Sequence, residues 1–208
     1  MVLTDPVRSA RRRTLLVQIG AWSIGVFPLA LLAFRFLDDG LGANPIEELI
    51  LHFGRWAIVL LLAALAVTPA RRLTGLNALA RARRLLGLFG FGYVALHFLT
   101  YLVLDQFFAW EYIWEDIAER PFITVGFAAF VLLIPLAVTS TRGWVRRLGR
   151  NWVRLHRLFY VAAVLAVIHY YWNVRGDEPL PLVAIVVVAA LLAARLPSVA
   201  RRLTAARS

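Results

Sequence analysis

Six long apolar stretches constrain the fold of this chain more than any other feature of its sequence. About 20 helical residues, rising about 1.5 Å each, cross a hydrocarbon core of about 30 Å, and the stretches are close to this length. Open strands would leave backbone groups unpaired in lipid, so we predict an all-α, polytopic membrane bundle of about six transmembrane helices. The stretches cover residues 14–36, 46–68, 85–104, 121–139, 152–173 and 180–196, of which the last is the shortest.

The composition agrees with lipid as the main solvent. Of 208 residues, 61% are hydrophobic, and the mean hydropathy is +0.73. This apolar share is far above that of soluble domains, and a soluble chain of this size has too little interior to bury it. We interpret residues 1–208 as one transmembrane domain that begins with a basic cytoplasmic arm at 1–13.

Proline positions refine the expected spans. Two prolines, Pro28 and Pro135, lie inside spans and predict kinks. Five others are expected to mark helix ends: Pro45, Pro69, Pro121, Pro179 and Pro197. No internal repeat is evident along the chain.

The charges alternate from loop to loop. Eleven of the twelve acidic residues fall in the loops after the first, third and fifth spans, whereas the arginine clusters occupy the other loops and both termini. By the positive-inside rule, both termini are predicted to be cytoplasmic, in a bacterial inner membrane. The net charge of +11 does not indicate nucleic-acid binding, because the arginines sit in short clusters between apolar runs and not on one soluble face.

Four histidines are the candidate metal ligands. The chain has no cysteine, which excludes thiolate metal sites and iron–sulfur clusters. Counting about 1.5 Å per residue, His52, His97 and His169 lie about 18–25 Å from the cytoplasmic side, on three different helices. His156 alone is expected near the inner surface. Ionisable side chains are costly within lipid and tend to be functional there.

A haem explains this convergence better than a proton relay does. Bis-imidazole ligation needs two neutral histidines at similar depth on facing helices. A proton path favours intramembrane carboxylates, and the spans contain essentially none. Arg55 shares a helical stripe with His52 and Glu48; it is a candidate partner for a haem propionate, and pairing with Glu48 is an equally good interpretation. A non-redox scaffold or transporter remains the alternative in which the convergence is accidental.

Several segments resemble the MsrQ (YedZ) family, within the wider ferric-reductase-like transmembrane group. The resemblance rests on RARRLLGLFGFGYVALHFLTY at 81–101, RPFITVGFAAF at 120–130, LAVTSTRGW at 136–144 and LGRNWVRLHRLFYVAAVLAVIHYYW at 148–172. LGANPIEELILHFGRWAI at 41–58 and TPARRL at 68–73 fit as well. The family's histidines fall on His52, His97, His156 and His169.

The resemblance implies an electron-transfer function. Members of this family carry electrons from the respiratory chain, through quinol, to MsrP, a periplasmic molybdopterin enzyme that reduces methionine sulfoxide in envelope proteins. Haem b is the family's cofactor, and FMN is also attributed to it. The chain is then an electron-transfer subunit and not the catalytic one. The alternative within the wider group is a stand-alone ferric or cupric reductase.

One departure from the wider group concerns the inner end of the bundle. Ferric-reductase-like domains carry a second histidine thirteen or fourteen residues before the ligand of the third helix, and here those positions hold Arg84 and Arg83. We therefore expect one outer haem between His97 and His169, with His52 as a competing ligand. The inner site near His156 is left open to a weakly ligated haem, a flavin or a quinone headgroup.

Overall fold

Helices account for nearly all of the chain that is described. The computed structural model describes residues 6–38, 40–174, 178–199 and 201, and no strand occurs among them. Five segments are long and apolar enough to cross a membrane, which confirms the predicted polytopic all-α bundle. These segments are formed by α1 (Pro6–Leu37), α2 (Pro45–Thr74), α3 (Leu79–Thr100) with the turn that continues it to Asp105, α5 (Pro121–Val138), and α7 (Arg150–Leu155) with α8 (Leu158–Asn173).

The sixth predicted span is shorter than the other five. Helix α9 (Leu180–Ala193) has 14 residues, which at about 1.5 Å per residue is about 21 Å of helix. Its end is tied to α2, because the Arg195 guanidinium donates to the carbonyl oxygens of Leu191 and, at 2.5 Å, of Leu65. The predicted basic arm also differs in part, because residues 6–13 form the first turns of α1 and residues 1–5 lie outside the described chain.

Pro69 does not mark a helix end, so that prediction was wrong. It lies inside α2, which continues to Thr74 and ends at Gly75 in the left-handed conformation that glycine adopts freely (φ 70°). A proline leaves the carbonyl four residues earlier without its helical partner. Here that carbonyl belongs to Leu65, and Arg195 donates to it. A side chain that follows the end of α9 therefore satisfies the group that the proline leaves free.

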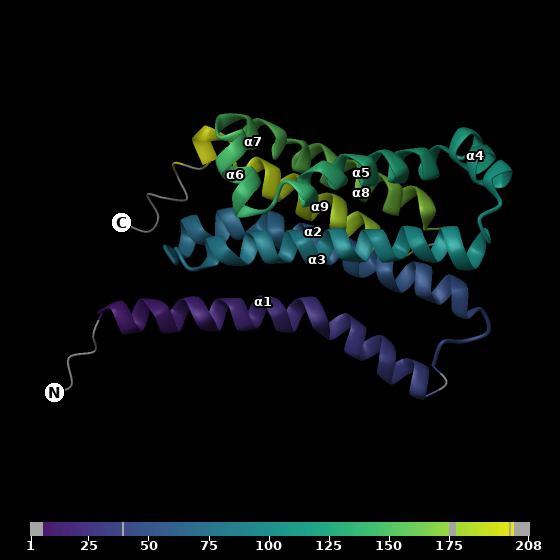
Figure 1. The fold of residues 1–208 in the computed structure, drawn as a ribbon, viewed down its shortest axis with the longest axis horizontal. Helices are drawn as coiled ribbons and strands as arrows, with labels where there is room; N and C mark the ends of the chain where they lie inside the picture. The colour runs from purple at the N-terminus through teal and green to yellow at the C-terminus, as the bar shows by residue number, and fades with distance from the viewer. Residues whose placement is uncertain (1–5, 39, 175–177, 200, 202–208) are drawn as a thin grey trace.

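Pro28 bends α1, as the sequence predicts, and the bend is visible in Figure 1. Side chains from two neighbouring helices hold this region. Tyr93 of α3 donates its hydroxyl to the Gly25 carbonyl at 2.8 Å, and a ring nitrogen of His52 on α2 lies 3.0 Å from the Pro28 carbonyl. Both contacts are buried, so the kink is fixed against the bundle.

Short helices occupy two of the segments expected to be loops. Helix α4 (Trp110–Glu119) lies at one end of the bundle, where it follows a π-helical turn, η1 (Tyr101–Asp105), that continues α3. Helices α6 (Arg142–Leu148) and α7 (Arg150–Leu155) lie at the other end, and α7 leads almost directly into α8. The exposed aromatic residues of α4 include Trp110, Tyr112 and Trp114.

Helix α2 is the centre of the bundle. Its residues Leu60, Leu61 and Leu65 are almost completely buried, and each belongs to a different core cluster. These clusters join α2 to α1 and α3, to α5 and α8, and to α8 and α9. Large apolar side chains cover much of the outer surface, for example Val186 of α9 at 67% exposure, as expected for helices that face lipid.

The two ends of the bundle differ in charge. The first turn of α1 and the last turn of α9 lie at the same end as α6 and α7, and α4 lies at the opposite end (Figure 1). We call the end with Arg71, Arg83 and Arg84 the arginine end, and the end with α4 the acidic end. The arrangement follows the alternation of charge along the sequence.

Candidate haem site

Two histidines from different helices face each other towards the acidic end of the bundle. His97 lies near the end of α3 and His169 near the end of α8. Their ring centroids are 6.0 Å apart, and the ring planes meet at 75°. Both side chains line one cavity of about 270 Å³, which we call the histidine-pair cavity. The structure thus brings together the two residues that are the first choice from the sequence.

Hydrogen bonds to the main chain orient both rings. Nδ1 of His97 lies 2.9 Å from the Ile50 carbonyl oxygen, and Nδ1 of His169 lies 2.7 Å from that of Phe122. A carbonyl oxygen only accepts, so each Nδ1 carries the proton and donates. This tautomer leaves a lone pair on each Nε2, and neither Nε2 has a hydrogen-bond partner among the described residues. A histidine held in this way is ready to ligate a metal.

A glycine makes room for each imidazole. A Cβ on Gly126 of α5 would lie 2.6 Å from Nδ1 of His169, and one on Gly54 of α2 would lie 3.1 Å from Nδ1 of His97. Ordinary van der Waals contacts begin at about 3.4–3.5 Å. The absence of a side chain at these positions therefore allows each ring to approach the neighbouring helix and reach its carbonyl.

The two halves of the site repeat one arrangement. Each histidine lies 47 residues after its carbonyl partner, and each glycine lies four residues after that partner. Every member of the second set, Phe122, Gly126 and His169, follows its counterpart by 72 residues. The helix pairs α2–α3 and α5–α8 thus form an internal repeat, and the expectation of no repeat was wrong. Its strongest elements are main-chain carbonyls, which carry no sequence signal.

The same offset relates core residues below the histidines. Ala57 and Ala129 are both 4% exposed, and Leu61 and Leu133 are 2% and 3% exposed. Each of these pairs is separated by 72 residues. The repeat therefore extends from the histidines into the packing between the helices, where small and large residues alternate in the same way in both halves.

Polar side chains close the acidic end of the histidine-pair cavity. The Tyr101 hydroxyl, at the start of the π-helical turn, donates to Asp116 of α4 at 2.9 Å. Arg120 forms an ion pair with the same carboxylate at 3.0 Å. All three residues line the cavity together with Asp105. Sequence reasoning missed Tyr101, Asp116 and Arg120, because their link depends on the unpredicted helix α4.

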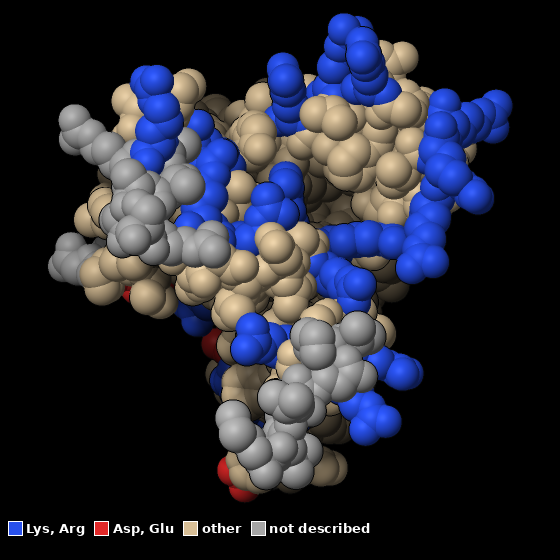
Figure 2. Space-filling model, turned by 90° about the vertical axis from the view of Figure 1, so that its left-hand side faces the viewer, with Lys and Arg blue, Asp and Glu red and all other residues tan. Residues whose placement is uncertain are grey.

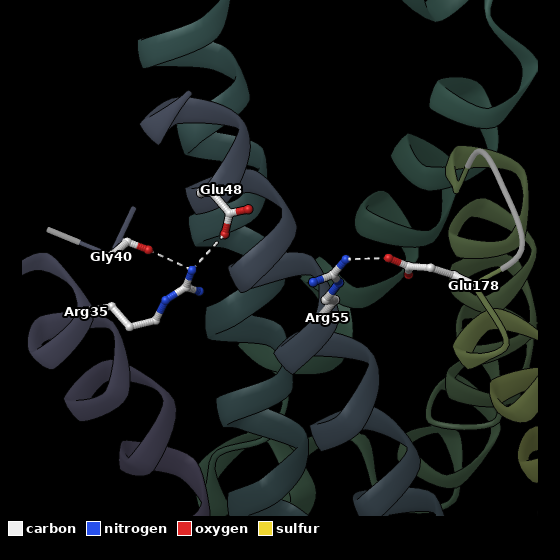
Figure 3. A network of polar contacts seen from close by, with 5 residues as sticks. All are labelled: Arg35, Gly40, Glu48, Arg55 and Glu178. Atoms are coloured by element: carbon white, nitrogen blue, oxygen red, sulfur yellow. Dashed lines mark hydrogen bonds and ion pairs between the residues drawn. The ribbon is translucent and has the colours of Figure 1, made fainter. Parts of the chain in front are cut away.

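Arg55 also lines the cavity, but its ion-pair partner is not the expected one. Its guanidinium lies 3.2 Å from Glu178, whereas Glu48 pairs with Arg35 at 3.2 Å, and Arg35 also donates to the Gly40 carbonyl (Figure 3). Both members of the Arg55–Glu178 pair are more than 40% exposed, so the pair is weak in water-facing surroundings. Arg55 therefore stands at the mouth of the cavity, next to the chain segment between α8 and α9.

The other two histidines lie elsewhere. His52 is 7% exposed and contacts Pro28 of α1; it does not line the histidine-pair cavity. His156 lies towards the arginine end, where it lines a separate cavity of about 400 Å³. Its ring stacks on Trp152, with centroids 3.8 Å apart. The four sequence candidates thus separate into one facing pair and two single residues.

The two histidine nitrogens suit a metal whose other ligands belong to a cofactor. Two nitrogen ligands, each about 2.0–2.1 Å from one metal ion and on opposite sides of it, place their ring centroids roughly 6 Å apart. Among the residues that the structure describes, no group of three or more His, Cys, Asp or Glu side chains is placed to hold a bare metal ion. A haem supplies four nitrogens itself and needs only two axial ligands, which matches a lone pair of histidines.

Comparison with known proteins agrees with this geometry. The family described as "Ferric reductase like transmembrane component" matches residues 53–167, a range that includes His97 and His156 and ends two residues before His169. A protein of Rhodospirillum rubrum is 52% identical over 192 residues, covering 91% of this chain and 92% of its own length. It is named protein-methionine-sulfoxide reductase heme-binding subunit MsrQ. The chain belongs to the MsrQ family.

Two further members have the same name. The protein of Caulobacter vibrioides is 49% identical over 194 residues and covers 91% of this chain and 92% of its own length. That of Ralstonia nicotianae is 50% identical over 182 residues, with coverage of 86% and 84%. The resemblance inferred from sequence motifs is therefore confirmed. This MsrQ-family chain is a multi-pass membrane protein, with the helices α2, α3, α5 and α8 arranged around two facing histidines.

Proposed function

We propose that this chain is a membrane electron-transfer subunit that holds one haem b between His97 and His169. The observation that carries the proposal is the facing pair itself, with both Nδ1 atoms hydrogen-bonded to carbonyls and both Nε2 atoms free. The relatives' name, which describes a heme-binding subunit, supports the same cofactor. Bound haem supplies a one-electron couple between ferric and ferrous iron.

The residues around the pair have separate tasks in this proposal. The carbonyls of Ile50 and Phe122 keep the imidazoles neutral and correctly turned, which raises their basicity as ligands. Apolar and aromatic side chains such as Phe98 and Phe130 exclude water from the cavity. Arg55 lies at the mouth, where a guanidinium suits a carboxylate of the cofactor.

We infer the donor and the acceptor from the family. Electrons come from the quinone pool of the bacterial inner membrane, with the arginine end in the cytoplasm by the positive-inside rule. They leave at the acidic end to MsrP, a periplasmic molybdopterin enzyme that reduces methionine sulfoxide. The position of the histidine pair near the acidic end supports this direction, because it shortens the final transfer to a periplasmic partner. FMN belongs to the proposal as a second cofactor.

Histidine variants test the haem site. Replacing His97 or His169 with Ala is expected to remove most of the low-spin haem signal from a reduced-minus-oxidised spectrum of the purified protein. His156→Ala is the matched control, because this residue lies in a different cavity, and its outer haem is expected to stay six-coordinate. Loss of haem in His52→Ala with a normal low-spin spectrum in His169→Ala would show that helices α2 and α3 form the site instead.

A reoxidation assay separates the proposed function from its main alternative, a stand-alone ferric or cupric reductase. Prereduced haem is expected to reoxidise when MsrP and a methionine sulfoxide substrate are added together, and to stay reduced with either one alone. Because the matching family is described as ferric reductase like, a ferric chelate is tested as a second electron acceptor in the same assay. Equally fast reoxidation by ferric chelate without MsrP would favour the reductase.

A further inference from the structure

Helix α4 has two faces of opposite character at the acidic end of the bundle. Ile113 and Asp116 are 3% and 8% exposed, and Asp116 lines the histidine-pair cavity. Glu111 and Glu115 are exposed, and each lies two residues from Ile113, about 200° around the helix. Glu119 is exposed at the next four-residue interval, and we call these three glutamates the acidic stripe. The acidic stripe therefore points away from the bundle.

The acidic stripe has no counter-charge within the described chain. Among the residues that the structure describes, none forms an ion pair or a side-chain hydrogen bond with it. Every arginine described at this end already pairs with another carboxylate: Arg35 with Glu48, Arg55 with Glu178, and Arg120 with Asp116. Arginine side chains gather instead at the opposite end, which faces the viewer in Figure 2. Like charges four residues apart repel each other in a helix, so the acidic stripe favours positive charge on another molecule.

Exposed aromatic side chains accompany the acidic stripe. Tyr112 and Trp114 lie on its two sides and are 64% and 62% exposed. Phe107 and Phe108 precede α4, are 75% and 49% exposed, and have φ of 48° and 59°. No other non-glycine residue in the described part of the chain has a positive φ. Bulky residues are strained in this conformation, and strain of this kind clusters at functional sites.

The charge distinguishes a lipid surface from a protein as the occupant of this face. Trp and Tyr alone are typical of a membrane interface, but a bilayer offers no net positive charge, and anionic lipids repel the acidic stripe. A soluble protein with a basic patch complements the carboxylates, and aromatic rings are enriched in protein interfaces. The ten residues of α4 span about 15 Å, which suits the small contact area of transient redox complexes.

We propose that α4 is the docking face for a soluble redox protein that presents a basic surface patch. Asp116 and Ile117 of α4 line the same cavity as His97 and His169. A protein seated on the outer face of α4 is thus one helix diameter, about 10–12 Å, from this cavity. Tyr101 ties α4 to the helix of His97 through its hydrogen bond to Asp116 at 2.9 Å. The docked protein's role as electron acceptor rests on the proposed function, whereas docking itself does not.

Binding of purified MsrP, the acceptor in the proposed function, to the haem-loaded protein in phosphatidylcholine nanodiscs tests the docking face. Glu111→Gln/Glu115→Gln removes two exposed, unpaired charges. It is expected to weaken binding at low salt by at least about tenfold and to make binding less dependent on salt. Asp38→Asn/Glu47→Gln is the matched control, because it removes two exposed charges at the same end but outside α4. This control is expected to bind MsrP as the unchanged protein does.

Haem reoxidation is measured on the same samples, with MsrP and methionine sulfoxide in one series and a ferric chelate in the other. Each ferrous haem gives one electron to the acceptor in both series. Glu111→Gln/Glu115→Gln is expected to slow the reaction with MsrP in proportion to the loss of binding. It is expected to leave the reaction with the chelate at least as fast as before, because a small acceptor does not need the docking face.

The outcomes separate the docking face from the proposed function. Equal binding of MsrP by the two double variants would overturn the docking face, and the proposed function would stand if MsrP still reoxidised the haem. Binding that is weakened only in Glu111→Gln/Glu115→Gln, without any reoxidation, would support the docking face and overturn the electron acceptor.

Lipid as the occupant is tested with brominated phosphatidylcholine. The fluorescence of Trp114 is read as the difference between the unchanged protein and Trp114→Phe. Quenching of this fluorescence by the brominated lipid, with no relief on addition of MsrP, would show that lipid covers the face and would overturn the proposal. The haem spectrum is recorded in every sample, so loss of the cofactor is distinguished from loss of docking.

Discussion

Replacing Gly126 with Ala tests the geometry of the haem site at one atom. The added Cβ would lie 2.6 Å from the His169 Nδ1, 2.9 Å from the same ring's Cε1 and 2.9 Å from its Cγ. Relief to an ordinary contact requires the ring to move by roughly 0.8 Å. The ring has little freedom to do so, because Nδ1 is bonded to the Phe122 carbonyl at 2.7 Å and the ring stacks on the Phe122 side chain, with centroids 6.0 Å apart.

Gly126→Ala is expected to weaken the hydrogen bond that orients His169 and not to destabilise the helix. Loss of the Nδ1 hydrogen bond leaves a buried donor or acceptor unpaired, at a cost of about 1–3 kcal/mol. Loss of such a supporting contact typically weakens metal binding by about 10–100-fold. In a helix, Ala is otherwise more stable than Gly by about 0.5–1 kcal/mol, so a general effect on the helix would have the opposite sign.

The assay measures haem occupancy and midpoint potential in purified Gly126→Ala protein. Gly54→Ala is expected to act in the same direction but less strongly, because its Cβ would lie 3.1 Å from the His97 Nδ1. Gly87→Ala and Gly92→Ala are controls in the membrane-spanning part of α3, where a Cβ meets no atom within 4 Å. If Gly126→Ala kept the occupancy and potential of the unchanged protein, the close approach of α5 to His169 would have no part in holding the cofactor.

Three further predictions follow from the structure. His52→Ala is expected to leave the haem spectrum intact but to lower the thermal midpoint by roughly 2–8 °C, because the buried contact with Pro28 is lost; a changed ligand field would contradict this structural role. Reporter fusions in 140–150 are expected to be cytoplasmic and those in 105–119 periplasmic, and the reverse result would place the histidine pair near the cytoplasm. Acid–acetone is expected to extract the porphyrin, because the chain has no cysteine for covalent attachment; haem retained in the protein pellet would contradict a non-covalent b-type site.

Hydropathy was sufficient to predict five of the six expected spans, because lipid leaves the backbone few alternatives to helix. The errors arose where tertiary contacts decided the outcome. Pro69 was predicted to end a helix because the sequence does not show that Arg195, which follows α9, donates to the carbonyl that the proline leaves free. Similarly, Arg55 shares a stripe with Glu48, yet its ion-pair partner is Glu178, which lies just before α9. Long-range partners of this kind leave no local pattern.

The histidine pair could be predicted from the sequence, whereas the groups that orient the two rings could not. Depth alone placed His52 beside His97 and His169, since depth does not say which way a side chain faces. The decisive groups are the Ile50 and Phe122 carbonyls, and a main-chain carbonyl is the same whatever residue carries it. One usable signal remains in the sequence: each histidine follows a glycine by 43 residues, at 54 and 97 and again at 126 and 169. Only the structure shows why that spacing recurs.

The repeat also explains why the two ends of the bundle carry different side chains at corresponding positions. At the acidic end, both halves keep the histidine, the glycine and the carbonyl, so the two imidazoles are equivalent and suit a metal between them. At the arginine end, the two corresponding positions hold Arg84 and His156, so the halves are not equivalent there. A guanidinium beside an imidazole repels a cation and attracts an anion. The same two helix pairs therefore bring two imidazoles together at the acidic end and, about three to four helical turns away along α3, an imidazole and a guanidinium at the arginine end.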